Sequence, residues 1–325
     1  MKNNAELQAL AQSQEPAIRF LTATRLQDLA PSSRKAQRLQ RAIPDSPSVR
    51  SMLALRDAQG CLPYHAYQKW LGAHWTLAVL ADLGYPAGDE QLIPLYNQVM
   101  AWLFSDEHRA LFKKRTLAGR VRMHPSQEGN AIYYALMLGL DDERVDQLVE
   151  RILGWRWPDG GWNCSMKPEA HISSFMETLI PLRGLALYGK RRNHAPAQAA
   201  AREAAEIFLK RQLFKRQRTG STMNPDFVAL HFPCYWHYDI LFGLKVMAEA
   251  DLLEDARCDA ALDLLASKRL PAGGFPAEKK YYQVGKSTIR SRSAVDWGGT
   301  HKKKMNVWVT LEALAVLKRA GRISF

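Results

Sequence analysis

Residues 130–140 (NAIYYALMLGL) and 142–155 (DERVDQLVERILGW) predict two helices of different kinds. The first segment is apolar on almost every face, which is typical of a helix buried on all sides. The second carries its apolar side chains at helical spacing, from Val145 to Trp155, so it has one apolar stripe and lies on a surface. The pair therefore predicts a buried helix covered by an amphipathic one.

The same alternation recurs along the chain. The other pairs are 74–83 with 89–104, 173–188 with 195–212, and 237–250 with 254–267, and a last apolar helix spans 306–320. Strict alternation of the two kinds builds concentric layers, with buried helices inside and amphipathic helices outside. The sequence therefore predicts an all-α ring of about five to six helical hairpins.

The N-terminal region fits an atypical first hairpin, with helices over 15–29 and 46–56. It raises the number of inner helices to about six, which is enough to close a ring. The chain has 325 residues, of which 47% are apolar, so it can bury a large core. We expect residues 1–325 to form a single domain, with 1–60 as an N-terminal capping hairpin.

Paired glycines mark the turns of the predicted repeat. Residues 157–162 (WPDGGW) and 270–275 (LPAGGF) follow outer helices at the same place in the repeat, and 56–61 (RDAQGC) is a degenerate third copy. Glycine permits the positive φ of a tight reversal. Two copies at equivalent places support the repeat more strongly than one.

These turns resemble the QDGGW-type repeat of squalene and oxidosqualene cyclases and of protein prenyltransferase β-subunits. In that repeat the aromatic packs between the layers, and the turn ties one outer helix to the next inner helix. The resemblance runs from about residue 50 to the end, and the chain looks most like small uncharacterised bacterial members of this superfamily. It implies an α/α toroid and an isoprenoid-handling enzyme, cyclase-like or prenyltransferase-like, with an apolar substrate in the central cavity.

The sequence departs from both families at their reactive residues. It contains no DxDD motif, and the nearest counterpart is WHYD at 236–239, where Tyr238 holds the place of the proton donor and Asp239 keeps an acid. A tyrosine, with a pKa near 10, does not readily protonate an alkene. The zinc of the prenyltransferases is held by an Asp-x-Cys pair and a histidine, and here only Cys234 stands at the matching point.

Residues 231–239 (HFPCYWHYD) are the segment richest in reactive side chains. We expect Asp239, His237 and Tyr238 to be catalytic, with His237 as a general acid that Asp239 orients. Positions two apart do not share a helix face, so this pair needs a further partner.

Zinc is the one cofactor that the sequence suggests. His231, Cys234 and His301 are its candidate ligands, because zinc takes histidine nitrogen and cysteine sulfur. The alternative is that Cys234 is a buried small hydrophobe and that the histidines cap or line a loop.

Glu177 lies inside an apolar helix, where a carboxylate is costly unless it is paired. It is a candidate catalytic acid facing the lumen, or it bridges to a base on a neighbouring helix such as Lys245. Glu312 in the last inner helix has the same two interpretations.

Substrate-binding candidates lie at the starts of the inner helices. Tyr235, Trp236 and Trp308 are aromatics that either stabilise a cationic substrate or only pack the buried helices. His171 and Lys303 precede inner helices, whose N-termini attract anions. A diphosphate or carboxylate headgroup is therefore expected at this rim.

The formal charge of +13 is clustered in short basic runs, which suit a phosphorylated ligand, an anionic membrane or simply solvent. The rival function is a non-catalytic scaffold that binds a lipid, peptide or protein partner. Nucleic acid is not favoured, because no helix-turn-helix or zinc motif occurs. We expect a cytoplasmic protein, because the N-terminus is polar and no apolar run is long enough to span a membrane. The four cysteines are widely spaced, which predicts reduced thiols.

Overall fold

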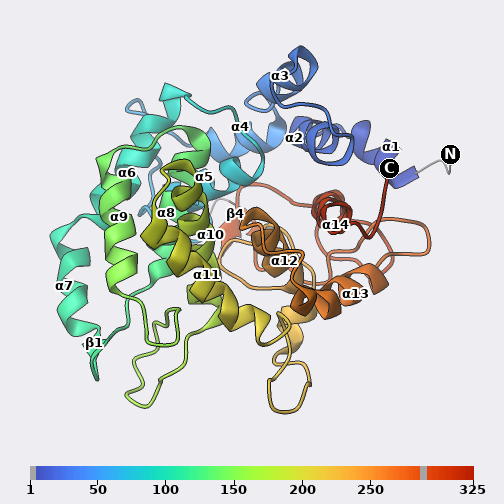
Figure 1. Cartoon of the computed structure of the whole chain (residues 1–325). Helices are drawn as coiled ribbons and strands as arrows, with labels where there is room; N and C mark the ends of the chain where they lie inside the picture. Colours follow the sequence, from blue (N-terminus) through green and yellow to red (C-terminus); the bar gives the residue numbers. More distant parts are fainter. Residues whose placement is uncertain (1–4, 286–290) are drawn as a thin grey trace.

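The computed structural model describes residues 5–285 and 291–325, and its regular structure is almost entirely helical (Figure 1). The first α-helices are α1 (Ala5–Ala11), α2 (Pro16–Leu21), α3 (Arg34–Arg41), α4 (Pro47–Leu53), α5 (Ala73–Asp82), α6 (Ile93–Leu103) and α7 (Asp106–Lys114). The later ones are α8 (Pro125–Leu138), α9 (Glu143–Gly154), α10 (Phe175–Arg191), α11 (Ala195–Leu209), α12 (Ile240–Glu249), α13 (Asp259–Ser267) and α14 (Val307–Arg319).

The shorter elements are one π-helical and three 3-10 segments and four two-residue strands. They are η1 (Thr22–Leu26), η2 (Glu90–Leu92), η3 (Pro225–Val228), η4 (Ala256–Cys258), β1 (Thr116–Leu117), β2 (Arg120–Val121), β3 (Gln283–Val284) and β4 (Arg292–Ser293). Strands β1 and β2 pair antiparallel, and β3 and β4 pair parallel.

Six helical segments of the described chain form an inner ring: α2 with η1, α5, α8, α10, α12 and α14. From α5 to α14 each one packs against the next, and α14 packs against α2 and η1. Phe20 of α2 closes the ring of helices by packing against Gly84, which follows α5. A Cβ added to Gly84 would lie only 2.8 Å from the phenyl group of Phe20. The chain is an α/α toroid.

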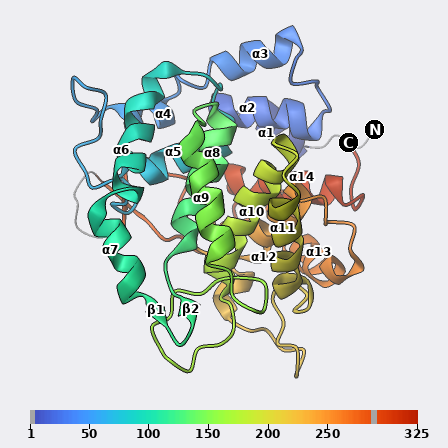
Figure 2. The same cartoon turned by 60° about the vertical axis from the view of Figure 1, so that its left-hand side comes forward.

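Four further helices form the outer layer. Helix α6 packs on α5 and α8, α9 on α8, α11 on α10, and α13 on α12 and α14. Figures 1 and 2 show them around the outside of the ring. The alternation of inner and outer helices that the sequence predicts is confirmed.

Burial explains why the two kinds of helix differ in sequence. In the inner helix α5, every residue from Ala73 to Ala81 is buried. In the outer helix α9, the buried residues are Val145, Leu148, Val149 and Ile152, which lie on one stripe. Buried apolar side chains form one continuous core from Leu10 to Leu317.

The predicted glycine turn occurs three times with the same hydrogen bonds. The amides of Trp157, Leu270 and Asp57 donate to the carbonyl oxygens of Gly161, Gly274 and Cys61, four residues on. Each turn has a glycine at the fourth position with positive φ, at 97° in Gly160, 89° in Gly273 and 81° in Gly60. The third copy therefore begins at Asp57, one residue later than the start of the 56–61 stretch.

Two of these turns are bound to the next inner helix by a threonine. Thr178 of α10 accepts a hydrogen bond from the Trp162 amide and donates one to the Trp162 carbonyl, both at 3.2 Å. Thr310 of α14 makes the same two bonds with Phe275, at 2.9 and 3.2 Å. The turn thus ties an outer helix to the next inner helix.

Helices α8 and α10 approach each other at two glycines. A Cβ on Gly129 would lie 2.7 Å from the Pro181 backbone, and one on Gly184 would lie 2.6 Å from the Gly129 carbonyl oxygen. Side chains there would force the helices apart, so this contact fixes their separation.

Helix α8 begins earlier than the sequence suggests. The sequence predicts this helix over residues 130–140, but the helix starts at Pro125, which is compatible with a first helical position. Its polar side chains from Ser126 to Asn130 are buried, and one oxygen of the Glu128 carboxylate lies 3.1 Å from His108 on α7. Ser126 Oγ, the other Glu128 oxygen and Asn130 Nδ2 have no hydrogen-bond partner among the described residues. Tertiary partners therefore extend this helix beyond its apolar part. Helices α1, α3 and α7 were also not predicted.

All four cysteines are free thiols. Within residues 5–285 and 291–325, no helix combines the length and the apolar character that crossing a membrane requires.

We expect Trp162→Ala to lower the free energy of unfolding by about 3 kcal/mol, as for other buried aromatics. The Trp162 side chain is 1% exposed, and its indole N–H donates to the Ile152 carbonyl at 2.8 Å. Trp157, whose indole donates to the Val121 carbonyl at 2.7 Å, should behave alike. Chemical denaturation measures the change. Trp236→Ala, at a half-buried tryptophan, is the control, and an equal loss in all three variants would contradict the structural role.

Candidate functional site

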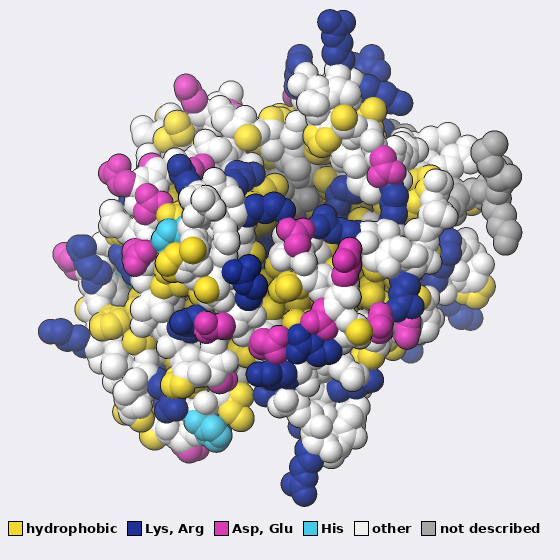
Figure 3. All heavy atoms as spheres, in the orientation of Figure 1, with side chains coloured by type: hydrophobic (Ala, Val, Ile, Leu, Met, Phe, Trp, Pro, Cys, Tyr) yellow, Lys and Arg dark blue, Asp and Glu magenta, His cyan; other side chains and the backbone are white. Residues whose placement is uncertain are grey.

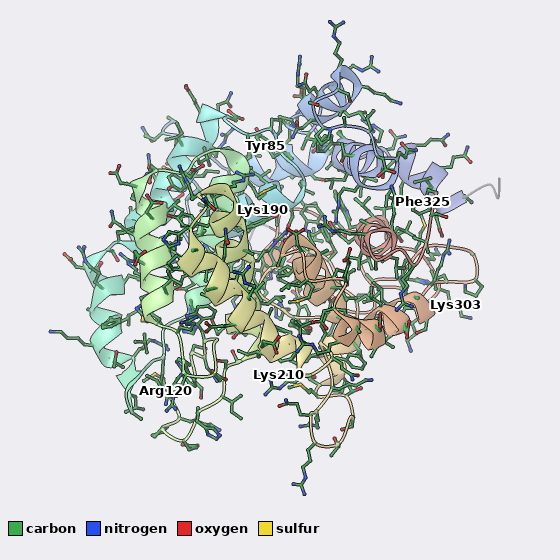
Figure 4. All side chains as sticks on the ribbon, in the orientation of Figure 1. Tyr85, Arg120, Lys190, Lys210, Lys303 and Phe325 are labelled. Atoms are coloured by element: carbon green, nitrogen blue, oxygen red, sulfur yellow. The ribbon has the colours of Figure 1, made fainter. Side chains whose placement is uncertain are left out.

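A cavity of about 650 Å³ opens at the C-terminal end of the inner helices. Helices α5, α8, α12 and α14 all line it with their C-terminal halves, which confirms that the inner helices run parallel. Figure 3 shows this face hollowed, with acidic and basic side chains around the opening, and Figure 4 places Tyr85 and Lys190 on it. Its volume lies in the range of small-molecule sites.

The floor of the cavity is a network of charges centred on the buried Arg183 of α10, whose side chain is 3% exposed. Its guanidinium donates two hydrogen bonds to the Glu249 carboxylate, at 2.6 and 2.8 Å, and one to Asp82 at 2.7 Å. It also donates to the Tyr133 hydroxyl at 2.6 Å. One guanidinium therefore joins α5, α8, α10 and α12.

Lys245 continues the network toward the last inner helix. Its ammonium donates to Asp82 at 3.0 Å and to Glu312 at 3.3 Å. Glu312 also accepts two hydrogen bonds from Arg25 of η1, at 2.9 and 3.0 Å. Three cations and three carboxylates thus alternate, and the network has no net charge.

The network holds its acids ionised. Burial alone would raise the pKa of Asp82, but Arg183 and Lys245 outweigh it and lower that pKa. Burial is likewise outweighed at Glu312, where Arg25 and Lys245 lower the pKa to about 2. These two carboxylates are therefore fixed hydrogen-bond acceptors at neutral pH, and neither can donate a proton.

The walls of the cavity are apolar and aromatic, with contributions from Phe20, Tyr85, Tyr133, Met137 and Val316. The mouth carries further charges, again in pairs. Asp28 pairs with Lys318 at 2.6 Å, and Arg319 pairs with Asp251 at 2.6 Å. These mouth groups are exposed to different degrees.

At the opposite end of the ring, Asp239 pairs with His231 and not with His237. His231 Nδ1 lies 2.8 Å from the carboxylate, which also accepts from the His231 and Phe242 amides and so caps α12. Burial lowers the pKa of His231, but Asp239 outweighs it and the pKa is raised. His231 and Asp239 are eight positions apart, and they meet because the segment between them loops back over the start of α12.

His237 lies flat on Tyr281, with ring centroids 3.4 Å apart. Burial, and then the charges of His231 and Lys69, lower its pKa to about 3, so it is a neutral imidazole. The buried His231 Nε2 and His237 Nδ1 have no hydrogen-bond partner among the described residues. The general-acid role expected for His237 stays a prediction, but its partner is not Asp239.

Tyr238 is 2% exposed, and its hydroxyl donates to the Leu213 carbonyl at 2.6 Å. Its ring packs among Phe175, Phe208 and Phe227, and burial raises its pKa well above the ordinary value. These contacts account for Tyr238 as a packed core residue.

The three aromatics expected to bind substrate are packed against other rings. Tyr235 stacks on Trp70 with centroids 4.2 Å apart, and Trp308 stacks on Phe232 at 4.9 Å. Trp236 is half-buried, with the Lys69 ammonium 5.2 Å from its centroid.

Glu177 is buried, with its side chain 1% exposed, and it does not reach Lys245. It accepts from the Ser126 amide at 3.2 Å and lies 3.1 Å from His124 Nδ1. The base that Glu177 meets at a neighbouring helix is therefore His124 and not Lys245. For Glu312 the expected bridge is confirmed.

His171, His301 and Lys303 are exposed on loops. Among the described residues, His231, Cys234 and His301 do not form a group whose ligand atoms lie within metal-binding range of one another, whereas His124, Cys164 and Glu177 do. His301 is exposed, whereas His231 is buried.

Most of the cavity floor was missed. Asp82, Arg183 and Glu249 each lie in or at the end of an apolar helix, and that is the same signal that marked Glu177 and Glu312. If every charged residue in an apolar helix had been treated as a candidate, the sequence would have indicated this network.

No family model matches this chain, and no curated protein matches it. Two solved structures are similar in overall course. A crystal structure of a protein from Actinoplanes has a TM-score of 0.48 and 15% identity, covering 98% of this chain and 97% of that one. The unsaturated glucuronyl hydrolase of Bacillus sp. GL1, responsible for the degradation of glycosaminoglycan, has a TM-score of 0.42 and 12% identity, covering 98% of this chain and 87% of that one.

Arg183→Met should lower the free energy of unfolding by about 1.5–3 kcal/mol, because it removes the buried cation that bonds to Asp82, Glu249 and Tyr133. Lys190→Met, on the same helix but at an exposed ion pair with Asp251, should change it by less than about 1 kcal/mol. Urea denaturation of both variants measures the difference. Equal losses would mean that the Arg183 network does not stabilise the fold.

The His231–Asp239 pair should make stability depend on pH. The folded protein holds the His231 proton more tightly than the unfolded chain, whose pKa is about 6.5. This contribution is complete below about pH 6.5 and is lost as the pH rises through the folded pKa. His231→Asn keeps a donor near Asp239 but cannot titrate. The difference in unfolding free energy between parent and variant should therefore shrink with rising pH, and a difference that stays constant contradicts the pairing. His301→Asn, at an exposed histidine, is the control.

Proposed function

We propose that this chain binds a small polar molecule, uncharged or zwitterionic and rich in hydroxyl or amino groups, in the cavity at the C-terminal end of the inner helices. The supporting observation is the floor of alternating fixed charges. Such a floor offers strong acceptors and strong donors side by side. A ligand that presents both kinds of group can bond to it without bringing an unbalanced charge.

The same floor argues against an isoprenoid in this cavity. A prenyl tail buried there would cover Asp82, Lys245 and Glu249 and remove them from water without replacing its hydrogen bonds. A diphosphate would meet carboxylates as well as cations. The isoprenoid-handling interpretation therefore lacks an apolar compartment at this end of the ring.

The fixed protonation of the floor favours binding over acid–base catalysis here. General acid–base catalysis works best with a group whose pKa lies near the working pH. The pKa of Asp82 is lowered, that of Glu312 is about 2, and that of Lys245 is raised. The aromatic walls complete a binding site, because the rings of Phe20 and Tyr85 can cover the apolar face of a sugar-like or amino-acid-like ligand.

Calorimetric titration with three kinds of probe tests the proposal. The probes are neutral mono- and oligosaccharides, zwitterionic amino acids, and a prenyl diphosphate. We expect binding within the first two classes. Ala87→Trp narrows the mouth at an exposed position and should weaken that binding at least about tenfold, or 1.4 kcal/mol.

Ala110→Trp, at an exposed alanine of helix α7, is the matched control and should bind like the parent. Binding of the prenyl diphosphate but of neither polar class contradicts the proposal. So does polar binding that Ala87→Trp leaves unchanged, and so does the absence of binding by every probe.

A further inference from the structure

A second cluster of reactive side chains lies at the other end of the ring, at the N-termini of α8 and α10. His124 is at the N-cap position of α8, Glu177 is in the first turn of α10, and Cys164 is in the loop between α9 and α10. One ligand atom from each of the three lies within 4.8 Å of the others. The cavity proposed above does not include any of them.

The geometry points to a zinc site formed by His124, Cys164 and Glu177. Zinc bonds of about 2.0–2.3 Å in a tetrahedral shell put ligand atoms roughly 3.3–3.8 Å apart. His124 Nδ1 and the Glu177 carboxylate are already 3.1 Å apart. Closing the shell around an ion therefore needs only small rotations of His124 and Cys164, which are both partly exposed.

The backbone holds two of the ligands in place. Helices α8 and α10 cannot separate or approach without disturbing the contact of Gly129 with Pro181 and Gly184, so His124 and Glu177 keep their spacing. Glu177 is also fixed by the Ser126 amide, which donates to its second oxygen at 3.2 Å.

The loop that carries Cys164 is held by two arginines. Arg122 is fully buried and donates to the carbonyls of Ser165, Pro168 and Ala170, at 2.5, 3.3 and 3.2 Å. Arg115 lies 3.5 Å from the Cys164 carbonyl. A loop bound at four carbonyls within seven residues presents its thiol in a set position, as a metal site requires.

The ligand types select the ion. Calcium and magnesium prefer oxygen alone, whereas sulfur, nitrogen and oxygen together suit zinc or a similar transition metal. With the thiol proton released to solvent on binding, the cysteine and glutamate charges balance a divalent ion. Three protein ligands leave the fourth position for water or a ligand atom, which is the arrangement of catalytic rather than structural zinc sites.

Cobalt titration of the full chain, freed of metal by a chelator, tests the site. We expect one cobalt ion per chain with a thiolate-to-cobalt absorption band, and displacement of that band by zinc. Cys164→Ser should abolish the band, and His124→Asn should weaken zinc binding at least about tenfold. His124 is partly exposed, so its replacement does not disrupt the core.

Two cysteine variants serve as controls. Cys61→Ser replaces a thiol of similar exposure, and Cys234→Ser replaces the thiol that the sequence suggested; both should keep the band. A band that survives in Cys164→Ser and vanishes in Cys234→Ser overturns the assignment. No thiolate band, or no stoichiometric zinc binding by the parent, overturns it too. Ala87→Trp should bind zinc normally, which separates this site from the cavity.

Discussion

The structure depends on one buried guanidinium. Arg183 is bonded at once to Asp82, Glu249 and Tyr133, which lie on three other inner helices. Each bond fixes the rotation of a helix about its own axis, because the charged group must face the ring centre. Apolar side chains alone would allow an inner helix, apolar all round, to settle in several rotations. A buried ion network of this kind adds little net stability after desolvation, but it penalises every arrangement that leaves a charge unpaired.

The position of this network divides the lumen into unlike ends. On the C-terminal side the charges form the floor of an open cavity with paired ions at its mouth. On the N-terminal side the space is filled by stacked aromatic rings, with Trp70 on Tyr235 and His237 on Tyr281. Groups able to bind a metal or accept a proton therefore gather at one end. Groups with fixed charge gather at the other.

The two ends of the ring also differ in the kind of structure that positions their side chains. The cavity is built by side chains of regular helices, whose positions follow from the ring itself. The N-terminal end is built by loops, and buried polar groups secure these loops: Arg122 for the 164–170 segment and Asp239 for the 231–239 segment. Loops held in this way can carry reactive groups at precise places without widening the ring.

By itself the sequence determined the layered helical fold. The spacing of the apolar residues distinguishes buried helices from surface helices. Gly60, Gly160 and Gly273 mark turns that need positive φ. Both features depend on neighbouring residues only, so the sequence alone predicts them. Which charges would meet was decided by the tertiary structure. Asp82 and Arg183 are 101 positions apart in the sequence, and Arg25 and Glu312 are 287 apart, so these pairs meet only when the ring closes. Proximity in the sequence therefore favoured the 231–239 segment as the candidate site. Ring closure instead brought together the charges of the cavity floor. Close helix packing brought together His124, Cys164 and Glu177.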